Sequence, residues 1–418
     1  MKYLRLALLV FASTLGLARA QDEEERRAPP TEIPDFSNLD EYIYEPKSTV
    51  TIGIRHLSGP KTQFAGQGRI VSPEDAGPTT GNNITRNYHD GTVSPDARFV
   101  PRVDSSGNPV IDPDSNGQVF DKVAPDGKTN TWAYGDARQA SEAPGYVAFH
   151  TYSANIVDTA TRSLDALSSL GLDLTVTRDM GQLFGTRMTW NLTAGMSAND
   201  ISAKTSGYVL ADRLTRTDYY SLFGQTAPSA PYSAPSSTTQ TVLDAAGNTV
   251  TNTDGSSQLV SVDTTVLISD QPVASMSSSL RDATSVTSRW KLKGAYYTFR
   301  AGPTIWIPIT SRFRASFSFG PALVYAGTDY TVTETFTPDI GADLTDTNSS
   351  QTYHLMPGYY ADANLQFDIT ERAGLYAGAV FQSAGTYKQN LDAENAHYTT
   401  KVDLSNQSGL RAGMTVRF

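Results

Sequence analysis

The side chains best suited to acid–base or nucleophilic chemistry are five histidines: His56, His89, His150, His354 and His397. A catalytic histidine needs a nucleophile and an orienting acid within hydrogen-bond reach. Serine is so plentiful that such a set can be drawn around any of the five, which carries little information. The sequence has no G-x-S-x-G elbow, no H-E-x-x-H motif and no cysteine. We therefore predict loop or rim histidines, with no catalytic residue, no metal centre and no cofactor.

One polar turn resembles the first half of a calcium loop. Asp112, Asp114 and Asn116 occupy ligand positions 1, 3 and 5, and Gly117 follows at position 6. Position 12 is Val123, where calcium needs a bidentate glutamate. A polar turn is the favoured interpretation, and a weak surface calcium site is the alternative.

Two short segments combine aromatic and polar side chains, residues 88–91 (Tyr-His-Asp-Gly) and 132–135 (Trp-Ala-Tyr-Gly). Such clusters stack sugars in some proteins. They can equally pin the loop that carries them onto the mouth of a barrel, which is the interpretation we favour here.

The elements that position these residues alternate between apolar and polar side chains. In residues 48–57, Val50, Ile52 and Ile54 share one face, and Thr51, Gly53 and Arg55 share the other. The same period of two runs through 169–178, 184–197, 297–309, 313–325, 359–369, 375–381 and the end of the chain. Short turns alternate with longer polar segments, of which 58–144 and 199–285 are the largest. This pattern predicts an all-β, antiparallel, up-and-down arrangement.

Charged residues lie on the face opposite to the apolar one. If the strands close into a barrel, these side chains point into its lumen and pair with one another. The lumen-facing set is Arg55, Asp173, Arg187, Arg300, Arg314, Asp362, Asp368, Asp403, Arg411 and Arg417. Both signs of charge are present, which favours a packed ion-pair core over a selective pore.

The start of the chain predicts export. Residues 1–20 have a positive start with Lys2 and Arg5, an apolar core and a small-x-small site, as a cleaved secretory signal peptide does. Residues 21–47 are acidic and contain proline, and we interpret them as a periplasmic lead-in. The chain has 33 Lys and Arg against 43 Asp and Glu, which disfavours nucleic acid as a partner.

The last residues carry a resemblance to a known family. Leu410, Ala412, Met414, Val416 and Phe418 point one way in a period-two strand. With a polar residue, a glycine and two apolar residues two positions apart, the tail resembles the signal read by the bacterial β-barrel assembly machinery. The residues that fill those places are Arg411, Gly413, Val416 and Phe418.

This resemblance implies an integral outer-membrane β-barrel of the small outer-membrane-protein or porin-like kind. We expect residues 48–418 to form a transmembrane barrel of eight strands, with ten or twelve as alternatives, and large extracellular loops at about 58–144 and 199–285. The implied partners are outer-membrane lipid and lipopolysaccharide, with the assembly machinery and periplasmic chaperones during biogenesis. The predicted function is a non-enzymatic envelope-structural or surface-interaction role. A porin-like channel for small polar solutes is the alternative, and a lipid- or peptide-hydrolysing enzyme is the least favoured.

Overall fold

The computed structural model describes residues 47–418 apart from 116 and 166–167. The predicted signal peptide and nearly all of the predicted lead-in lie outside these residues. The described chain is all-β, with one four-residue helix, α2 (Arg138–Ser141). No helix in this part of the chain is long and apolar enough to cross a membrane.

One antiparallel sheet contains thirteen strands. They are β1 (Ser48–Leu57), β2 (Lys61–Val71), β9 (Tyr146–Ile156), β10 (Arg162–Asp165), β11 (Ser169–Gln182), β12 (Thr189–Ser221), β17 (Ala274–Pro308), β18 (Phe313–Phe336), β19 (Leu344–Asp368), β20 (Ala373–Ser383), β21 (Thr386–Ala393), β22 (Ala396–Asp403) and β23 (Gln407–Arg417). The sheet therefore holds more strands than predicted, and the expected count of eight is not confirmed for it.

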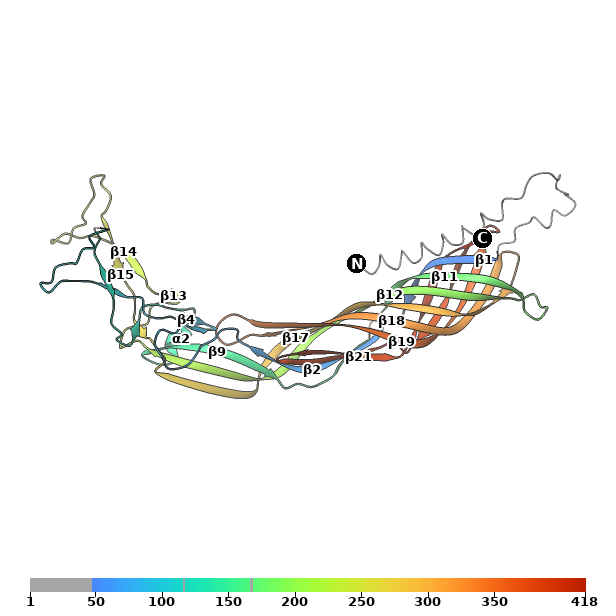
Figure 1. Ribbon diagram of the computed structural model, residues 1–418, viewed down its shortest axis with the longest axis horizontal. Coiled ribbons are helices and arrows are strands. Elements are labelled where there is room, and N and C mark those ends of the chain that lie inside the picture. Colours follow the sequence, from blue (N-terminus) through green and yellow to red (C-terminus); the bar gives the residue numbers. More distant parts are fainter. Residues whose placement is uncertain (1–46, 116, 166–167) are drawn as a thin grey trace. The chain divides into compact units, whose positions relative to one another are not determined.

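Part of the sheet closes on itself. Backbone pairing runs from β1 through β11, β12, β17, β18, β19, β20 and β23 and returns to β1. We call this circuit the closed section. Its short connections, 183–188, 309–312 and 369–372, lie at one end of the strands (Figure 1). All strand edges within the circuit are paired, so the closed section leaves no open edge.

Four strands continue beyond the closed section. Figure 1 shows β12, β17, β18 and β19 running on past the ends of β1 and β11. There β12 pairs with β9, β9 with β2, β2 with β22, and β22 with β21. We call this second part the extension.

The two parts bury opposite kinds of side chain, although each strand keeps a single alternation. In β18, Ser316 and Ser318 are buried inside the closed section, and Phe317 and Phe319 are about half exposed outside it. Further along the same strand, Tyr330 and its even-numbered neighbours are buried among apolar side chains, and polar residues face out. The closed section is thus polar inside and apolar outside, and the extension is the reverse.

The remaining elements form a second apolar cluster beside β9 and β12. Its buried members are Ala76, Tyr88, Val93, Trp132, Tyr134, Val147, Phe149, Tyr220, Leu222, Ala234 and Ile268. The short strands that contribute to it or project from it are β3 (Arg86–Tyr88), β4 (Gly91–Val93), β5 (Phe99–Pro101), β6 (Phe120–Lys122), β7 (Lys128–Thr129), β8 (Trp132–Tyr134), β13 (Tyr232–Ser233), β14 (Ser237–Thr241), β15 (Leu259–Asp263) and β16 (Ile268–Ser269).

The predicted loop boundaries are therefore wrong. The segment 58–144 contains β2, which belongs to the large sheet, and several short strands. The segment 199–285 is shortened at both ends, because β12 runs to Ser221 and β17 begins at Ala274. Both strands carry many polar residues on their outer face in the extension, which makes them look like loop in the sequence.

Candidate functional site

Five charged residues meet inside the closed section: Arg55, Asp173, Arg300, Asp362 and Arg411, here called the interior cluster. Asp173 accepts from Arg300 Nη2 at 2.7 and 2.8 Å and from Arg411 Nη1 at 3.0 Å. Arg411 Nη2 also donates to Asp362 Oδ1 at 2.8 Å. These contacts link β17, β11, β23 and β19, so a chain of ion pairs crosses the interior from wall to wall.

Neutral side chains supply further partners to the interior cluster, although Arg55 Nε and Arg300 Nε have no hydrogen-bond partner among the described residues. Arg55 donates to the hydroxyl of Ser197 and, at 2.9 Å, to Gln382 Oε1. Arg411 Nε donates to Asn364 Oδ1 at 2.7 Å. The guanidinium of Arg300 lies 5.5 Å from the ring centre of Tyr360. Each cation therefore has polar or aromatic partners, as buried charge requires.

Hydroxyl groups fill the space next to the interior cluster. Thr304 Oγ1 lies 2.6 Å from Thr193 Oγ1 and 2.7 Å from Ser318 Oγ, and Thr193 lies 3.3 Å from Thr177. The cavity that these residues line has a volume of only about 30 Å³. That is about the space of one water molecule, so these side chains leave little free space between them.

A second ion-pair group lies at the end of the closed section with the short turns. Asp368 Oδ2 is 3.1 Å from Arg314 Nε, and Asp368 Oδ1 accepts from Arg417 Nη2 at 2.6 Å. The Arg314 guanidinium stacks over the Trp306 ring at 4.6 Å. All four side chains are partly buried, and they narrow the interior at this end.

Two residues predicted to face the lumen lie elsewhere. Arg187 is exposed in the 183–188 turn, because β12 starts only at Thr189. Asp403 ends β22 in the extension, where its carboxylate accepts from Ser405 N–H and Thr386 Oγ1. Both corrections arise because alternation in the sequence does not show where a strand begins or which strand it pairs with.

The four residues of the predicted assembly signal lie on β23 or directly after it. Arg411 belongs to the interior cluster. Gly413 packs against the Ile52 carbonyl of β1 so closely that a Cβ would clash with it. Val416 and Phe418 are about half exposed on the apolar outer face. The placement says nothing about the signal itself, which stays a prediction.

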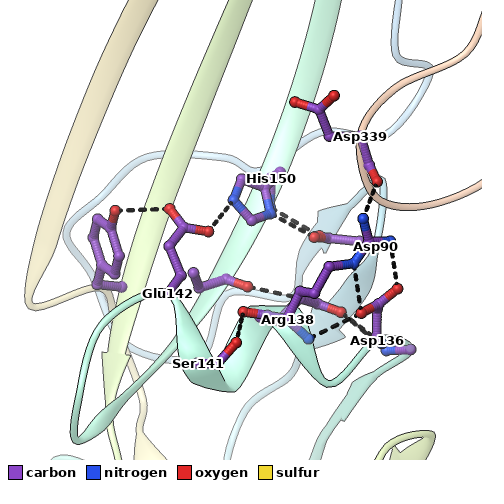
Figure 2. A network of polar contacts seen from close by, with 11 residues as sticks. Asp90, Asp136, Arg138, Ser141, Glu142, His150 and Asp339 are labelled. Atoms are coloured by element: carbon purple, nitrogen blue, oxygen red, sulfur yellow. Dashed lines mark hydrogen bonds and ion pairs between the residues drawn. The ribbon is translucent and has the colours of Figure 1, made fainter.

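A different polar network forms around His150 on β9 (Figure 2). His150 Nδ1 lies 2.6 Å from Asp90 Oδ2, and His150 Nε2 lies 3.0 Å from Glu142 Oε2. The backbone N–H of His150 donates to Asp90 Oδ1 at 2.8 Å, and Tyr219 donates to Glu142 at 3.0 Å. The network joins three segments that are far apart in the sequence.

Both ring nitrogens of His150 therefore face carboxylates. Burial opposes the charged imidazolium, but Asp90 and Glu142 outweigh it and raise the His150 pKa above 6.5. A general base needs a free nitrogen toward its substrate, and here neither is free. The sequence missed this site, because Asp90 and His150 are sixty residues apart and no motif spacing links them.

The same loop–helix region is tied to the connection between β18 and β19. Arg138 Nη1 donates to the Asp339 carbonyl at 2.7 Å (Figure 2). Arg213 Nη1 lies 2.5 Å from Asp339 Oδ2. Arg213 belongs to β12, so α2, β12 and the 337–343 connection are held together at one point.

The two aromatic segments singled out in the sequence are neighbours. Gly91 pairs with Tyr134, and Val93 pairs with Trp132, through β4 and β8. Trp132 and Tyr134 stack with ring centres 5.5 Å apart and are almost fully buried. The buried ring faces pack the second apolar cluster together beside β9 and β12. They therefore hold the loop to the extension, not to the mouth of the closed section, and are not available to stack on sugars.

The calcium-like segment is an exposed turn. Asp112 accepts from the Asp114 N–H at 3.0 Å and from Ser115 Oγ at 2.9 Å, and Asn116 lies outside the described residues. Across the described chain, no group of three or more His, Cys, Asp or Glu is placed to hold a metal ion.

Comparison with known proteins gives little. No family model matches the sequence, and no curated protein matches it. Among solved structures, the outer membrane protease OmpT from Escherichia coli matches with 10% identity, covering 89% of this chain and 97% of that one, at a TM-score of 0.25. A Pseudomonas aeruginosa FadL homologue matches with 9% identity over 89% and 90%, at a TM-score of 0.17. TM-scores this low carry no argument about fold or activity.

Proposed function

We propose that this protein is a non-conducting outer-membrane β-barrel that carries a folded β-structure at the cell surface for interaction with other molecules. The closed section is the membrane-spanning part, with eight strands, and the extension is the extracellular part. The function is structural and interactive, not enzymatic.

One observation carries the proposal: the reversal of inside and outside along β12, β17, β18 and β19. An apolar outer face with a polar interior fits a barrel surrounded by lipid, and an apolar interior with a polar outer face fits a structure surrounded by water. Leu170, Leu172 and Leu410 are each more than 60% exposed on the closed section. Apolar exposure on this scale marks a lipid or protein contact.

The order of the two parts along the strands supports the orientation. The short turns at one end of the closed section are typical of the periplasmic side of a barrel, and long connections are typical of the outer side. Tyr325 and Tyr353 stack at 6.0 Å where the outer face of β18 and β19 changes from apolar to polar. Aromatic side chains at this level fit a membrane–water interface.

The filled interior supports a non-conducting barrel over the porin alternative. The interior cluster crosses the lumen, the neighbouring cavity has a volume of only about 30 Å³, and the extension has an apolar core. An eight-stranded barrel leaves an interior just wide enough for side chains. The paired nitrogens of His150 likewise support a structural role for that residue.

The first test is single-channel conductance of residues 21–418 refolded into planar bilayers. We expect no conductance steps from protein shown to be folded by its heat-dependent gel shift. Stable ohmic steps of reproducible size would reject the filled lumen and favour a porin.

The second test uses the absence of cysteine from the chain. Ser206→Cys lies on the exposed face of β12 in the extension, and Ser311→Cys lies in the exposed turn between β17 and β18. In intact bacteria, a membrane-impermeant maleimide should label the first variant and reach the second only after lysis. The reverse labelling would contradict the orientation.

A further inference from the structure

We propose that the first part of β17, Ala274–Leu280, is a docking edge that binds an extended segment of another protein as an added β-strand. This inference deepens the interaction role proposed above and relies on it for the exposure of the extension at the cell surface. The juxtaposition that carries it is an open strand edge beside a row of exposed apolar side chains.

The edge is open over a long stretch. Residues 274–280 and 284–285 of β17 pair with β12 on one side, and pairing of β17 with β18 on the other side begins only at Val286. Among the described strands, none pairs with the free side of residues 274–285, and Figure 1 shows this gold segment at the border of the sheet. Every residue from Ala274 to Ala283 is exposed. An unpaired edge of this kind is a template for another strand.

Hydrogen bonds of β12 show which of its backbone groups are already used. Val157 N–H donates to the Leu210 carbonyl, and Leu222 N–H donates to the Gly145 carbonyl. In an antiparallel ladder, residues alternate between the two neighbouring strands. Even-numbered residues of β12 from 210 to 222 therefore bond toward β9, and odd-numbered ones bond toward β17.

The register then assigns the free groups on β17. Thr217 is the partner of Met276, so even-numbered residues of this segment bond to β12. Ser275, Ser277 and Ser279 must direct their N–H and C=O groups to the open side. The edge thus offers three donors and three acceptors at the spacing of a β-ladder.

The side chains define the partner further. Met276 and Leu280 are 62% and 46% exposed on one face, and Ser275, Ser277 and Ser279 lie on the other. Residues 274–280 contain no charged residue and no proline, which are features that natural sheets use to block such edges. The chemistry fits an uncharged extended segment with apolar side chains at alternate positions, which would cover Met276 and Leu280.

The edge ends where a partner strand would have to stop. The pairing of β12 and β17 shifts register between Ala211 and Arg213, and Asp282 has a φ of 48°. Such a bulge bends a strand and interrupts pairing. Arg281 and Asp282 also place charge at this point. The docking edge is therefore limited to about the length of Ala274–Leu280.

Its position suits a protein partner. Tyr297 lies near the boundary of the apolar band. The strand between Met276 and Tyr297 is roughly 70 Å long. With the extension outside the cell, this edge is far from lipid along the strand. The membrane is therefore not the partner that the edge fits.

The test uses the refolded full-length mature chain and a fluorescent synthetic peptide alternating Thr and Val over the length of Ala274–Leu280, followed by fluorescence anisotropy. Ser277→Pro removes a free N–H at the edge without breaking the ladder to β12, which an edge strand tolerates. Ser277→Ala keeps the N–H and is the matched control. We expect saturable binding by wild type and Ser277→Ala, and binding weakened about tenfold or more by Ser277→Pro.

Two further measurements separate backbone pairing from general stickiness. A peptide methylated on alternate backbone nitrogens should bind at least tenfold more weakly, since it lacks ladder donors. Met276→Thr should weaken binding of the Thr–Val peptide while leaving the gel shift of the folded barrel unchanged.

Three results would overturn the inference: no binding by folded wild-type protein, equal binding by Ser277→Pro, or equal binding of the methylated peptide. A dimer of the free protein that Ser277→Pro abolishes would assign the edge to a second copy instead. Failure here, with silent bilayers and the expected maleimide labelling, would leave the proposed barrel intact and reject only the docking edge.

Discussion

Replacing Asp173 by Asn should destabilise the protein by about 3–5 kcal/mol, the cost of removing one partner from a buried ion pair. The Asp173 carboxylate, 2% exposed, accepts hydrogen bonds from both Arg300 and Arg411. The interior cluster has three cations and two anions. The substitution therefore leaves three guanidinium groups with a single carboxylate in the cluster, that of Asp362. The asparagine amide also presents to the cations either its NH₂ group or a carbonyl oxygen, which is a weaker acceptor than a carboxylate.

The assay is urea unfolding of the refolded protein in detergent micelles, followed by the heat-dependent gel shift. Domains of this kind are stabilised by about 5–15 kcal/mol in total, so the expected loss is large enough to shift the midpoint clearly. Asp114→Asn, in an exposed turn, is the matched control and should change stability by less than about 0.5 kcal/mol. If the urea midpoint of the Asp173→Asn variant lay within error of that of the control, the idea that buried ion pairing organises the interior would be refuted.

Three further predictions concern other parts of the chain. Burial raises the pKa of Glu334, in the core of the extension, from 4.5 to about 7. The folded protein therefore holds this proton more tightly than the unfolded chain does. As the pH rises through that range, the free energy of unfolding falls by up to about 3 kcal/mol. Glu334→Gln should therefore raise the urea midpoint at pH 8 and change it little at pH 4, and an equal gain at both pH values would contradict the buried-acid explanation. The raised pKa of His150 means that its ion pairs contribute fully below pH 6.5 and are lost as pH rises through the raised value. Limited proteolysis of the segment around α2 should therefore speed up as the pH is raised above 6.5, and His150→Gln should remove that dependence. Ala412→Arg, on the apolar outer face of β23, should cost about 2–4 kcal/mol in lipid vesicles, whereas Ser206→Arg on the polar face of β12 should cost almost nothing; equal yields of folded protein from the two variants would argue against lipid around the closed section.

Alternation in the sequence predicted the strands of the closed section because both of its faces have a strong chemical contrast there. Residues 313–319 are an example: aromatic and aliphatic residues face out, and serine or arginine faces in. The predicted turn at 310–312 was also close to the observed one, because strong alternation on both sides leaves little freedom in the boundary.

The extension was not predicted, and the reason is physical. Its strands carry Thr, Ser and Lys on the outer face, so β2 and the second half of β12 look like polar loop. Strand β2 pairs with β22, more than 300 residues further along the chain, and no local pattern carries that information. The aromatic segments at 88–91 and 132–135 were the available sign of an ordered outer structure.

The candidate site was predicted in part for the same reason. Inward charges such as Arg300 and Asp362 follow from the phase of a strand, but their partners depend on which strands face each other across the interior. The position of Arg187 depended on the exact start of β12, which alternation does not define. His150 and Asp90 meet only through the folding of the extension.

The uninterrupted alternation of side chains along β18 limits which insertions and deletions such a chain can tolerate during evolution. From Phe313 to Phe336 one alternation serves two surroundings with opposite demands, so deletion of one residue at its middle reverses one half of the strand against the other. Removing a residue near Leu323 would turn either Phe317 into the interior or Tyr330 into water. Insertions and deletions should therefore survive in these long strands only in pairs, or at the connections, and homologous chains should differ in strand length by even numbers of residues.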